Sequence, residues 1–252
     1  MKKAEVYQAQ LTALDHWEPF LLKESGLPGP RGNLELAQVV ADLGTSAQFE
    51  HWLTFDAEQA PTNTPQEFLA FCGAVGLGRL LAEGQKRRLK TLQRCAADPR
   101  WRMREGVAMA LQRWGDADLD ALIAAMEIWS RGNVLEQRAA AAALCEPRLL
   151  KDKAQVKRVL DVLDTITATL PAVADRKSEG FIALRKGLGY CWSVAVAASP
   201  ADGQKAMERW LTSRNPDVRW IMKENLKKNR LVRADAAWVK KWQSYLDQTA
   251  SL

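Results

Sequence analysis

Hydrophobic residues recur at every third or fourth position through most of the 252-residue chain. Leu11, Leu14, Trp17 and Leu21 follow this spacing near the start, and it returns in residues 121–129. Such spacing places apolar side chains on one face of an α-helix, while the strict alternation typical of strands is nearly absent. The pattern predicts an all-α protein of about a dozen helices.

Turn-forming residues mark where the predicted helices begin. Asn33 is a predicted N-cap for the segment NLELAQVVADLG, and the APTNTP segment at 60–65 precedes another helix. Further starts are predicted at four residues that each precede a proline, namely Asp98, Leu170, Ser199 and Asn215. The chain therefore reads as helices with short connectors, closed by DAAWVKKWQSYLDQ at 235–248.

One motif of an aliphatic residue, an arginine and then small or apolar residues returns along the chain. Its copies cover residues 103–111, 137–145, 184–192 and 218–226, and a weaker copy without the arginine covers 69–77. Successive arginines are 34, 47 and 34 residues apart. Spacings of this size, each holding one helix pair, predict an α-solenoid.

The full motif begins with Asp or Asn and Pro, and it resembles the second helix of a HEAT repeat over roughly residues 64–230. In length, helix density, tryptophan content and basic charge, the chain is similar to the DNA alkylation repair (alkylpurine DNA glycosylase) relatives of this class. In those proteins the repeats cradle a DNA duplex. The resemblance implies a right-handed α-solenoid, an armadillo-like superhelix of about five HEAT-like helix pairs. We expect one continuous domain, with an acidic helical cap at 1–60 and the repeat array at 61–252.

The resemblance also implies a test for catalysis. A glycosylase of this family needs an aspartate flanked by tryptophans in its groove, and Asp116 beside Trp114 is the nearest candidate. We expect Asp116 at a turn instead, as the N-cap of the next helix, and the inward positions of the central repeats are mostly alanines. His16 and His51 are the only histidines, and no serine or cysteine has a recognisable base nearby. No catalytic residue and no cofactor is predicted.

The repeat arginines have two possible roles. They lie at the edge of the buried stripe, where an arginine can bond a carboxylate or helix end of the neighbouring repeat and form a structural ladder. The same guanidinium groups could instead contact phosphates. The four residues are Arg104, Arg138, Arg185 and Arg219.

The net charge of +6 is unevenly distributed. Residues 1–85 hold 5 basic and 11 acidic residues, whereas residues 86–252 hold 31 basic and 19 acidic ones. Such a field attracts a polyanion to the C-terminal part, although lysine-rich solvated helix faces explain the same composition. A macromolecular partner, protein or nucleic acid, is expected.

Candidate partner contacts combine basic and aromatic side chains. Lys223 and Lys227 form the best basic stripe, helped by the QKRRLK run at 85–90 and by Lys228 and Arg230. In DPRWRMREGVAMALQRWGD, we expect Arg102 on the solvent side together with Arg113, while Trp101 either faces a partner or packs under a helix. The complete candidate set is Trp101, Arg100, Arg102, Tyr190, Trp220, Lys223 and Lys227.

Four cysteines lie far apart within helical patterns and are predicted to be reduced core thiols. Asp116, Asp118 and Asp120 imitate a calcium loop, but Ala121 stands where that loop needs glycine, so no metal site is predicted. The glycines of GAVGLG at 73–78 and of KGLGY at 186–190 indicate close helix packing rather than a dinucleotide fingerprint.

The sequence shows no apolar run of membrane-spanning length, and no signal-peptide pattern, because Glu5, Gln8 and Gln10 come before any apolar run near the start could reach the length of a signal peptide. A cytoplasmic location without membrane contact is expected. The predicted function is a non-enzymatic binding scaffold that presents a concave surface and a basic C-terminal half to its partner. The alternative is a DNA-binding relative of the alkylation-repair glycosylases.

Overall fold

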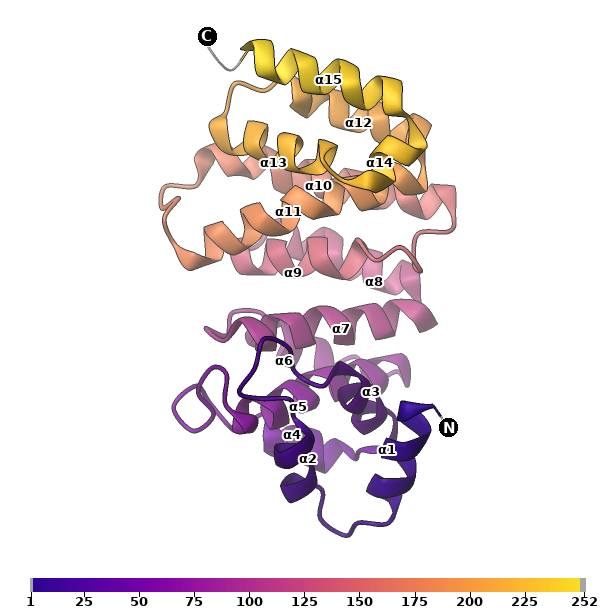
Figure 1. Ribbon diagram of the computed structural model, residues 1–252, viewed down its shortest axis with the longest axis vertical. Coiled ribbons are helices and arrows are strands. Elements are labelled where there is room, and N and C mark those ends of the chain that lie inside the picture. Colours follow the sequence, from indigo (N-terminus) through magenta and orange to yellow (C-terminus); the bar gives the residue numbers. More distant parts are fainter. Residues whose placement is uncertain (1, 250–252) are drawn as a thin grey trace. The chain divides into compact units, whose positions relative to one another are not determined.

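The computed structural model describes residues 2–249, which form fifteen α-helices, one 3-10 turn and no strand (Figure 1). The all-α prediction is confirmed. Contacts divide the chain into two compact units, Met1–Asp118 and Leu119–Leu252. Residues 1–60 therefore belong to the first unit. No helix in the described part is long and apolar enough to cross a bilayer.

The first unit is built around one long apolar helix, α5, of whose 18 residues 14 are buried. Helices α3 and α7 pack on α5, as do α2, α4 and α6. The elements are α1 (Lys3–Thr12), α2 (Glu18–Glu24), α3 (Leu34–Leu43), α4 (Ser46–Trp52), α5 (Pro65–Ala82), α6 (Arg88–Cys95) and α7 (Trp101–Ala117).

Glycines allow the close approach of neighbours to α5. A Cβ atom added at Gly78 would lie 2.4 Å from the carbonyl oxygen of Ala110 on α7, and one at Gly76 would overlap the ring of Phe49. The close-packing interpretation of GAVGLG is confirmed. In the second unit Gly189 fits the same account against Trp220, but Gly187 does not, because its added Cβ meets only Arg138 at 3.9 Å.

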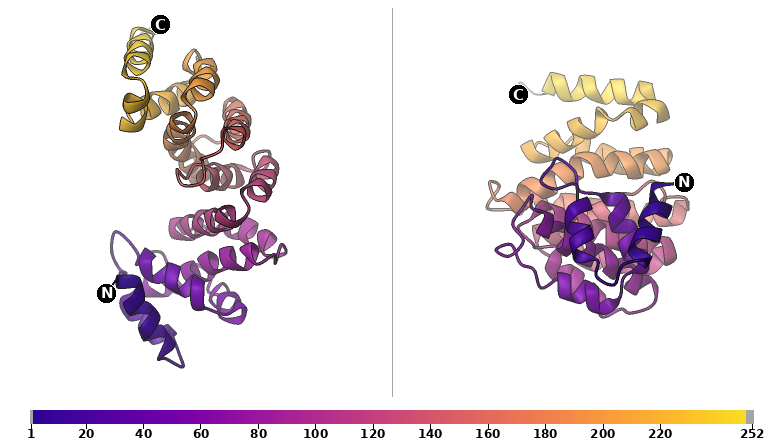
Figure 2. Two further views of the ribbon diagram at one scale, coloured as in Figure 1. Left: turned by 90° about the vertical axis from the view of Figure 1, so that its right-hand side faces the viewer. Right: turned by 60° about the horizontal axis from the view of Figure 1, so that its bottom comes forward.

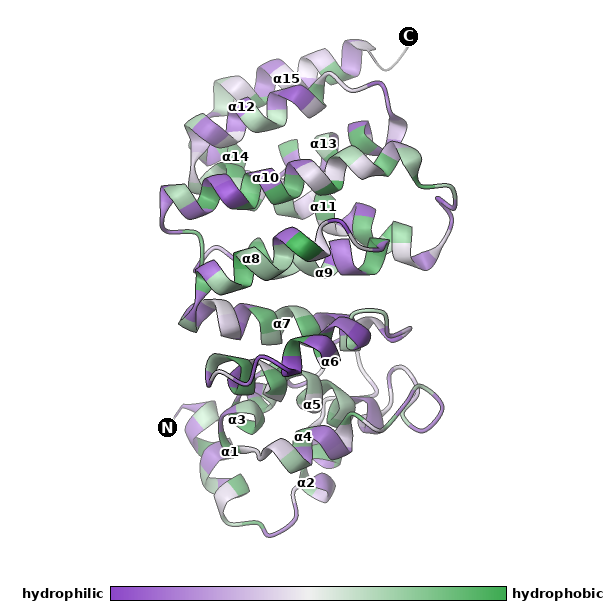
Figure 3. Ribbon diagram, turned by 180° about the vertical axis from the view of Figure 1, so that it is seen from behind, coloured by the Kyte–Doolittle hydropathy of each residue, from purple (hydrophilic) through white to green (hydrophobic). Residues whose placement is uncertain are grey.

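The second unit has two layers of helices. Helices α9, α11 and α13 pack side by side in one layer, and α8, α10 and α12 form the other; Figure 2 (left) looks along these helices. Helix α8 is mostly hydrophobic, whereas polar and apolar residues alternate around α10 and α12 (Figure 3). The elements are α8 (Leu119–Trp129), α9 (Val134–Leu144), α10 (Lys153–Thr169), the 3-10 turn η1 (Leu170–Ala172), α11 (Glu179–Ala198), α12 (Pro200–Leu211), α13 (Pro216–Leu226), α14 (Asn229–Ala234) and α15 (Ala236–Gln248).

The five copies of the repeat motif fall on alternate helices, α5, α7, α9, α11 and α13. The stripe predicted to bury α7 is buried, from Met103 at 1% exposure to Trp114 at 7%. Asn225, in the copy on α13, is also fully buried. Its side-chain amide donates to the carbonyl of Leu188 on α11, and its side-chain oxygen accepts from the backbone N–H of Ser193. The motif thus marks the helices that pack side by side within each unit.

Several predicted helix starts are confirmed. Asn33 is the N-cap of α3, with its side chain accepting from the N–H of Leu36, and Asn215 caps α13 in the same manner. Two predictions are wrong by a turn or less. Helix α7 begins at Trp101 because the Asp98 carboxylate binds the N–H of Arg100 before the helix starts. It then runs through Asp116 to Ala117, so Asp116 is not an N-cap.

Candidate functional site

The arginines of the DPRWR segment lie inside the first unit. Arg100 is 3% exposed, and its guanidinium donates to the carbonyls of Phe55, Asp56 and Ala60. The same group is paired with Asp98 at 2.7 Å. These bonds satisfy Arg100 within the fold, so we do not retain it as a partner contact.

Arg102 forms a buried ion pair with Glu67, whose carboxylate lies 3.1 Å away and is fully enclosed. It also donates to the carbonyl of Gly29, so the expectation that Arg102 faces solvent is wrong. A helical wheel places it on the outer side of α7, but the loop around Gly29 covers that side. Arg113 likewise reaches Gln38 and Asp42 on α3. Trp101 is 43% exposed and stacks with Arg102 at 4.4 Å.

All four repeat arginines are half-buried, as the edge of the apolar stripe predicts. Arg104 donates to the carbonyls of Asp98 and Pro99, just before its own helix. Arg185 pairs with Asp217 on α13 at 3.1 Å, and Arg219 donates to the carbonyl of Leu246 on α15. Arg185 and Arg219 thus each contact the second helix after their own within the unit. Arg138 is also partnered.

Four side chains on α11, α13 and α14 form what we call the arginine–aromatic cluster: Arg185, Trp220, Tyr190 and Arg230. The guanidinium of Arg185 lies 4.1 Å from the Trp220 ring centroid, and that ring rests on Gly189. The guanidinium of Arg230 lies 4.5 Å from the Tyr190 ring and donates to its hydroxyl at 2.6 Å. Tyr190 remains 43% exposed. The cluster therefore holds two aromatic rings against guanidinium groups, of which that of Arg185 is paired with Asp217 and that of Arg230 has no carboxylate partner among the described residues.

The predicted lysines are less free than their sequence suggests. Lys223 pairs with Asp247 at 3.0 Å and Lys227 with Glu224 at 2.5 Å. In the QKRRLK run, Arg88 is buried and pairs with Glu50. The hydrogen bond that Arg88 donates to the Glu50 carboxylate lowers the pKa of that carboxyl group. The positive charges of Lys223 and Lys227, which the sequence predicts as a basic stripe, are thus largely neutralised by these two carboxylates.

Positive charge without a counter-charge gathers slightly further along the chain. Residues 223–241 hold seven Lys and Arg and only two acidic residues. Both carboxylates are engaged: Glu224 binds Lys227, and Asp235 accepts from Trp238 and Gln204. The Trp238 N–H, followed by Gln204, lowers the pKa of Asp235. Within residues 2–249, Lys228 and Arg230 make no ion pair.

The candidates for chemistry do not gather into a catalytic arrangement. Trp114 is buried at 7% exposure, so it cannot stack on a base beside the exposed Asp116. Cys72, Cys145 and Cys191 are buried and free, and Cys95 is free and half-buried. Burial raises the pKa of the Cys72 and Cys145 thiols well above the ordinary value and that of Cys95 to about 11. Protonated thiols are poor nucleophiles.

No family model, curated protein or solved structure matches the chain. Its function must therefore be inferred from its own surface.

Sequence reasoning missed two features of the molecule. One is Glu67, whose position three residues after the N-cap Thr64 is the usual place of a solvated capping acid. The other is Arg233, which lies one helical turn after Arg230 on α14. The spacing of three residues was a visible signal for the second feature, because it places both arginines on one side of a short helix.

Proposed function

We propose that the protein is a non-enzymatic, HEAT-like repeat scaffold whose second unit binds an acidic macromolecular partner. The arginine–aromatic cluster is the observation that carries this proposal. Tryptophan, tyrosine and arginine dominate the energetics of binding surfaces, because each offers a large contact area together with a polar or charged group. In the cluster these three residue types lie together and partly exposed, with Tyr190 at 43%.

The repeat architecture supports the scaffold part of the proposal. Alternate helices carry one motif, and they pack side by side within each unit. Arg185 on α11 extends to α13, and Arg219 on α13 extends to α15, as expected for a ladder between repeats. An α-solenoid of this kind offers an extended surface to a partner, and a right-handed superhelix is the form we propose.

The charge of the second unit supports an acidic partner. Residues 119–252 hold 22 Lys and Arg and 15 Asp and Glu. Arg230, a member of the cluster, and Lys186, which follows Arg185 in the sequence, make no ion pair among the described residues. An approaching anion therefore meets positive charges that no carboxylate of the described chain neutralises. Nothing observed here favours the glycosylase alternative, and we do not propose it.

The test is a titration of the full chain with three labelled probes: a DNA duplex, a single-stranded oligonucleotide and a glutamate-rich peptide. We expect at least one to bind at low salt, with an affinity that falls steeply as salt is raised. The double variant Tyr190→Ser/Trp220→Ser should weaken that binding by about tenfold or more, the loss expected for two anchoring aromatic residues.

The matched control is Arg158→Gln. Arg158 belongs to the other helix layer, where it pairs with Asp120 and Glu127 across α8 and α10. This variant should bind as the unaltered chain does. The proposal is refuted if no probe binds at low salt, or if the cluster variant and the control lose equal affinity.

A further inference from the structure

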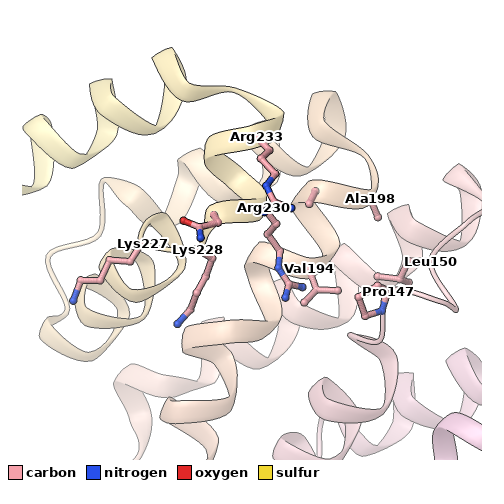
Figure 4. Close-up of a pocket in the computed structure, with 10 residues that line it drawn as sticks. Pro147, Leu150, Val194, Ala198, Lys227, Lys228, Arg230 and Arg233 are labelled. Atoms are coloured by element: carbon pink, nitrogen blue, oxygen red, sulfur yellow. The ribbon is translucent and has the colours of Figure 1, made fainter.

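A pocket of about 620 Å³ opens beside α14 in the second unit (Figure 4). Arg230 and Arg233 enter it from α14, and Lys228 precedes that helix. The opposite wall comes from the end of α11 and from the loop after α9. Its residues are Pro147, Leu150, Val194, Ala197 and Ala198.

One wall of this pocket is cationic and has no internal counter-charge. Its lining includes Lys227, Lys228, Arg230 and Arg233, and no carboxylate. Lys227 is paired with Glu224 and points away from Arg230 in Figure 4. Three cations remain, namely Arg230, Arg233 and Lys228, and Lys228 lines the pocket with its ammonium group turned away from Leu150. None of these three forms an ion pair within residues 2–249.

The acidic residues nearest in sequence are already engaged. Glu146, next to Pro147, pairs with Arg148 at 3.3 Å. Asp235, two residues after Arg233, caps α15 and binds Gln204. The other described pockets differ in this respect, since each includes at least one acidic residue in its lining.

Arg230 is held in place before any ligand arrives. Its guanidinium lies over the Tyr190 ring and donates one hydrogen bond to the hydroxyl of that residue. An arginine has five N–H donors, so most of its capacity is unused. A neutral aromatic support fixes the group without cancelling its charge, and such preorganisation reduces the cost of binding.

The opposite wall is apolar, and the volume exceeds what a bare inorganic anion fills. Pockets of about 300–1,000 Å³ ordinarily hold small organic molecules. Val194 and Leu150 are each at most 6% exposed and so are held firmly in the fold, while the exposed Pro147 and the half-buried Ala197 and Ala198 supply accessible apolar surface on the same wall. A ligand that fits both walls has an anionic end and an apolar body.

We propose that this pocket binds a small organic phosphate monoester, with the phosphate against Lys228, Arg230 and Arg233 and the apolar body against Val194 and Leu150. A phosphate monoester carries close to two negative charges at neutral pH and offers three acceptor oxygens. An arginine fork binds two oxygens of a carboxylate or of a phosphate, but only the phosphate has a third acceptor oxygen and nearly a second negative charge for the remaining cations. The pocket shares Arg230 with the arginine–aromatic cluster, but its lining excludes Tyr190 and Trp220, so this proposal does not rest on the macromolecular partner suggested above.

Phenyl phosphate is the probe for the intact chain, with inorganic phosphate and phenol as its two halves. We expect calorimetry to give saturable binding of phenyl phosphate with a Kd below about 1 mM. Inorganic phosphate should bind at least about tenfold more weakly, since it lacks the apolar contact. Phenol should show no saturation. A single-stranded oligonucleotide without terminal phosphate tests whether polymer phosphates compete.

Charge-removing variants assign the binding to the pocket. Arg230→Gln and Arg233→Gln should each weaken phenyl phosphate binding by about tenfold, the loss expected for one charged hydrogen bond. Lys240→Gln removes the same charge from an exposed position on α15 outside the pocket and should change nothing. Melting temperatures of all variants should match the unaltered chain, because the substituted groups are at the surface.

The binding should also depend on pH through the ligand alone. Below about pH 6 the phosphate monoester gains a proton, so its affinity should fall as pH decreases. The charged groups that face the phosphate are Lys227, Lys228, Arg230 and Arg233, and burial raises the pKa of the Cys145 thiol well above its ordinary value.

The proposal is overturned if phenyl phosphate does not saturate, if phenol binds equally well, or if Arg230→Gln, Arg233→Gln and Lys240→Gln bind alike. Preference for the oligonucleotide over phenyl phosphate would also overturn it, since the pocket would then serve a polymer backbone. Loss of the cluster-dependent binding alone, with phenyl phosphate retained, would refute only the proposed function.

Discussion

At the scale of single residues, the same side chain performs opposite tasks in the two units. Arg102 and Arg230 both stack on an aromatic ring, yet Arg102 is buried against Glu67 while Arg230 has no carboxylate partner among the described residues. A buried arginine destabilises the fold unless a carboxylate compensates its charge. A partly exposed arginine without such a carboxylate keeps a charge that a ligand can compensate. The geometry of the partners therefore separates arginines whose charge is compensated within the fold from those whose charge is not.

Glu67→Gln should destabilise the first unit by about 3–5 kcal/mol, because it leaves the Arg102 charge buried and unpaired. Urea unfolding followed by tryptophan fluorescence would measure this change. The double variant Glu67→Gln/Arg102→Met removes the stranded charge as well, and it should be less destabilised than Glu67→Gln alone.

Arg158→Gln is the comparison for a surface ion pair and should cost less than about 1 kcal/mol. Equal losses for Glu67→Gln and Arg158→Gln would contradict the distinction between buried and exposed pairs.

Residue roles in the first unit could not be read from the sequence. The side chains of Arg100 and Arg102 are compatible with phosphate binding and with internal bonding, and apart from Asp98 their hydrogen-bond partners are 35 to 73 residues away. Only folding brings the loop around Gly29 over the outer side of α7. By contrast, the half-buried position of the repeat arginines followed from helical spacing alone.

At the scale of helices, glycines decide how closely neighbours pack. Gly78 lies where α5 meets the backbone of α7 at Ala110, whereas Gly187 on α11 has free space around it. Both are helical positions, so the intrinsic preference of a helix for alanine is the same at each. The difference between the effects of alanine at these two positions on the free energy of unfolding therefore measures the contribution of helix packing.

Gly78→Ala should destabilise the protein by about 1–3 kcal/mol, because a Cβ atom would lie 2.4 Å from a backbone oxygen that cannot rotate away. Gly187→Ala should instead stabilise it, by up to about 1 kcal/mol. Denaturant midpoints of the two variants provide the measurement. Changes of the same sign would refute this account of α5 and α7.

The helices themselves were predictable where local chemistry fixes them. Asn33, Ser199 and Asn215 precede their helices as expected, because capping and proline act within a few residues. The Asp98–Pro99 start was misplaced, since the Asp98 carboxylate turns to the side chain and N–H of Arg100. The pocket was not predictable, because its walls come from three segments distant in sequence.

At the scale of the whole chain, buried thiols link stability to alkaline pH. Desolvation raises the pKa of Cys95 to about 11, against an ordinary value of 9.0. When the pKa of an acid is higher in the folded state than in the unfolded state, its contribution to stability is fully present below the unfolded-state pKa. That contribution is lost as pH rises through the folded-state pKa. Cys72 and Cys145 act in the same direction.

Stability should therefore decline between about pH 9 and 11, where unfolded thiols ionise and folded ones do not. The Cys95→Ser variant should show a shallower decline than the unaltered chain, because serine does not ionise in this range, and the comparison therefore isolates the contribution of this thiol. Unfolding free energies measured across this range at constant salt would test the expectation. Parallel curves for the two proteins would exclude a contribution from Cys95.

Asn225 gives the second unit a fixed alignment. Its amide is fully buried and bonded to both Leu188 and Ser193 of α11, so moving α13 along its axis would leave two polar groups unsatisfied in an apolar core. Hydrophobic contacts alone tolerate such sliding. Trp220 lies on the same helix, little more than one turn away, and its ring must meet both Gly189 and Arg185. A single buried amide thus fixes where the half-buried Trp220 ring lies at the surface of the second unit.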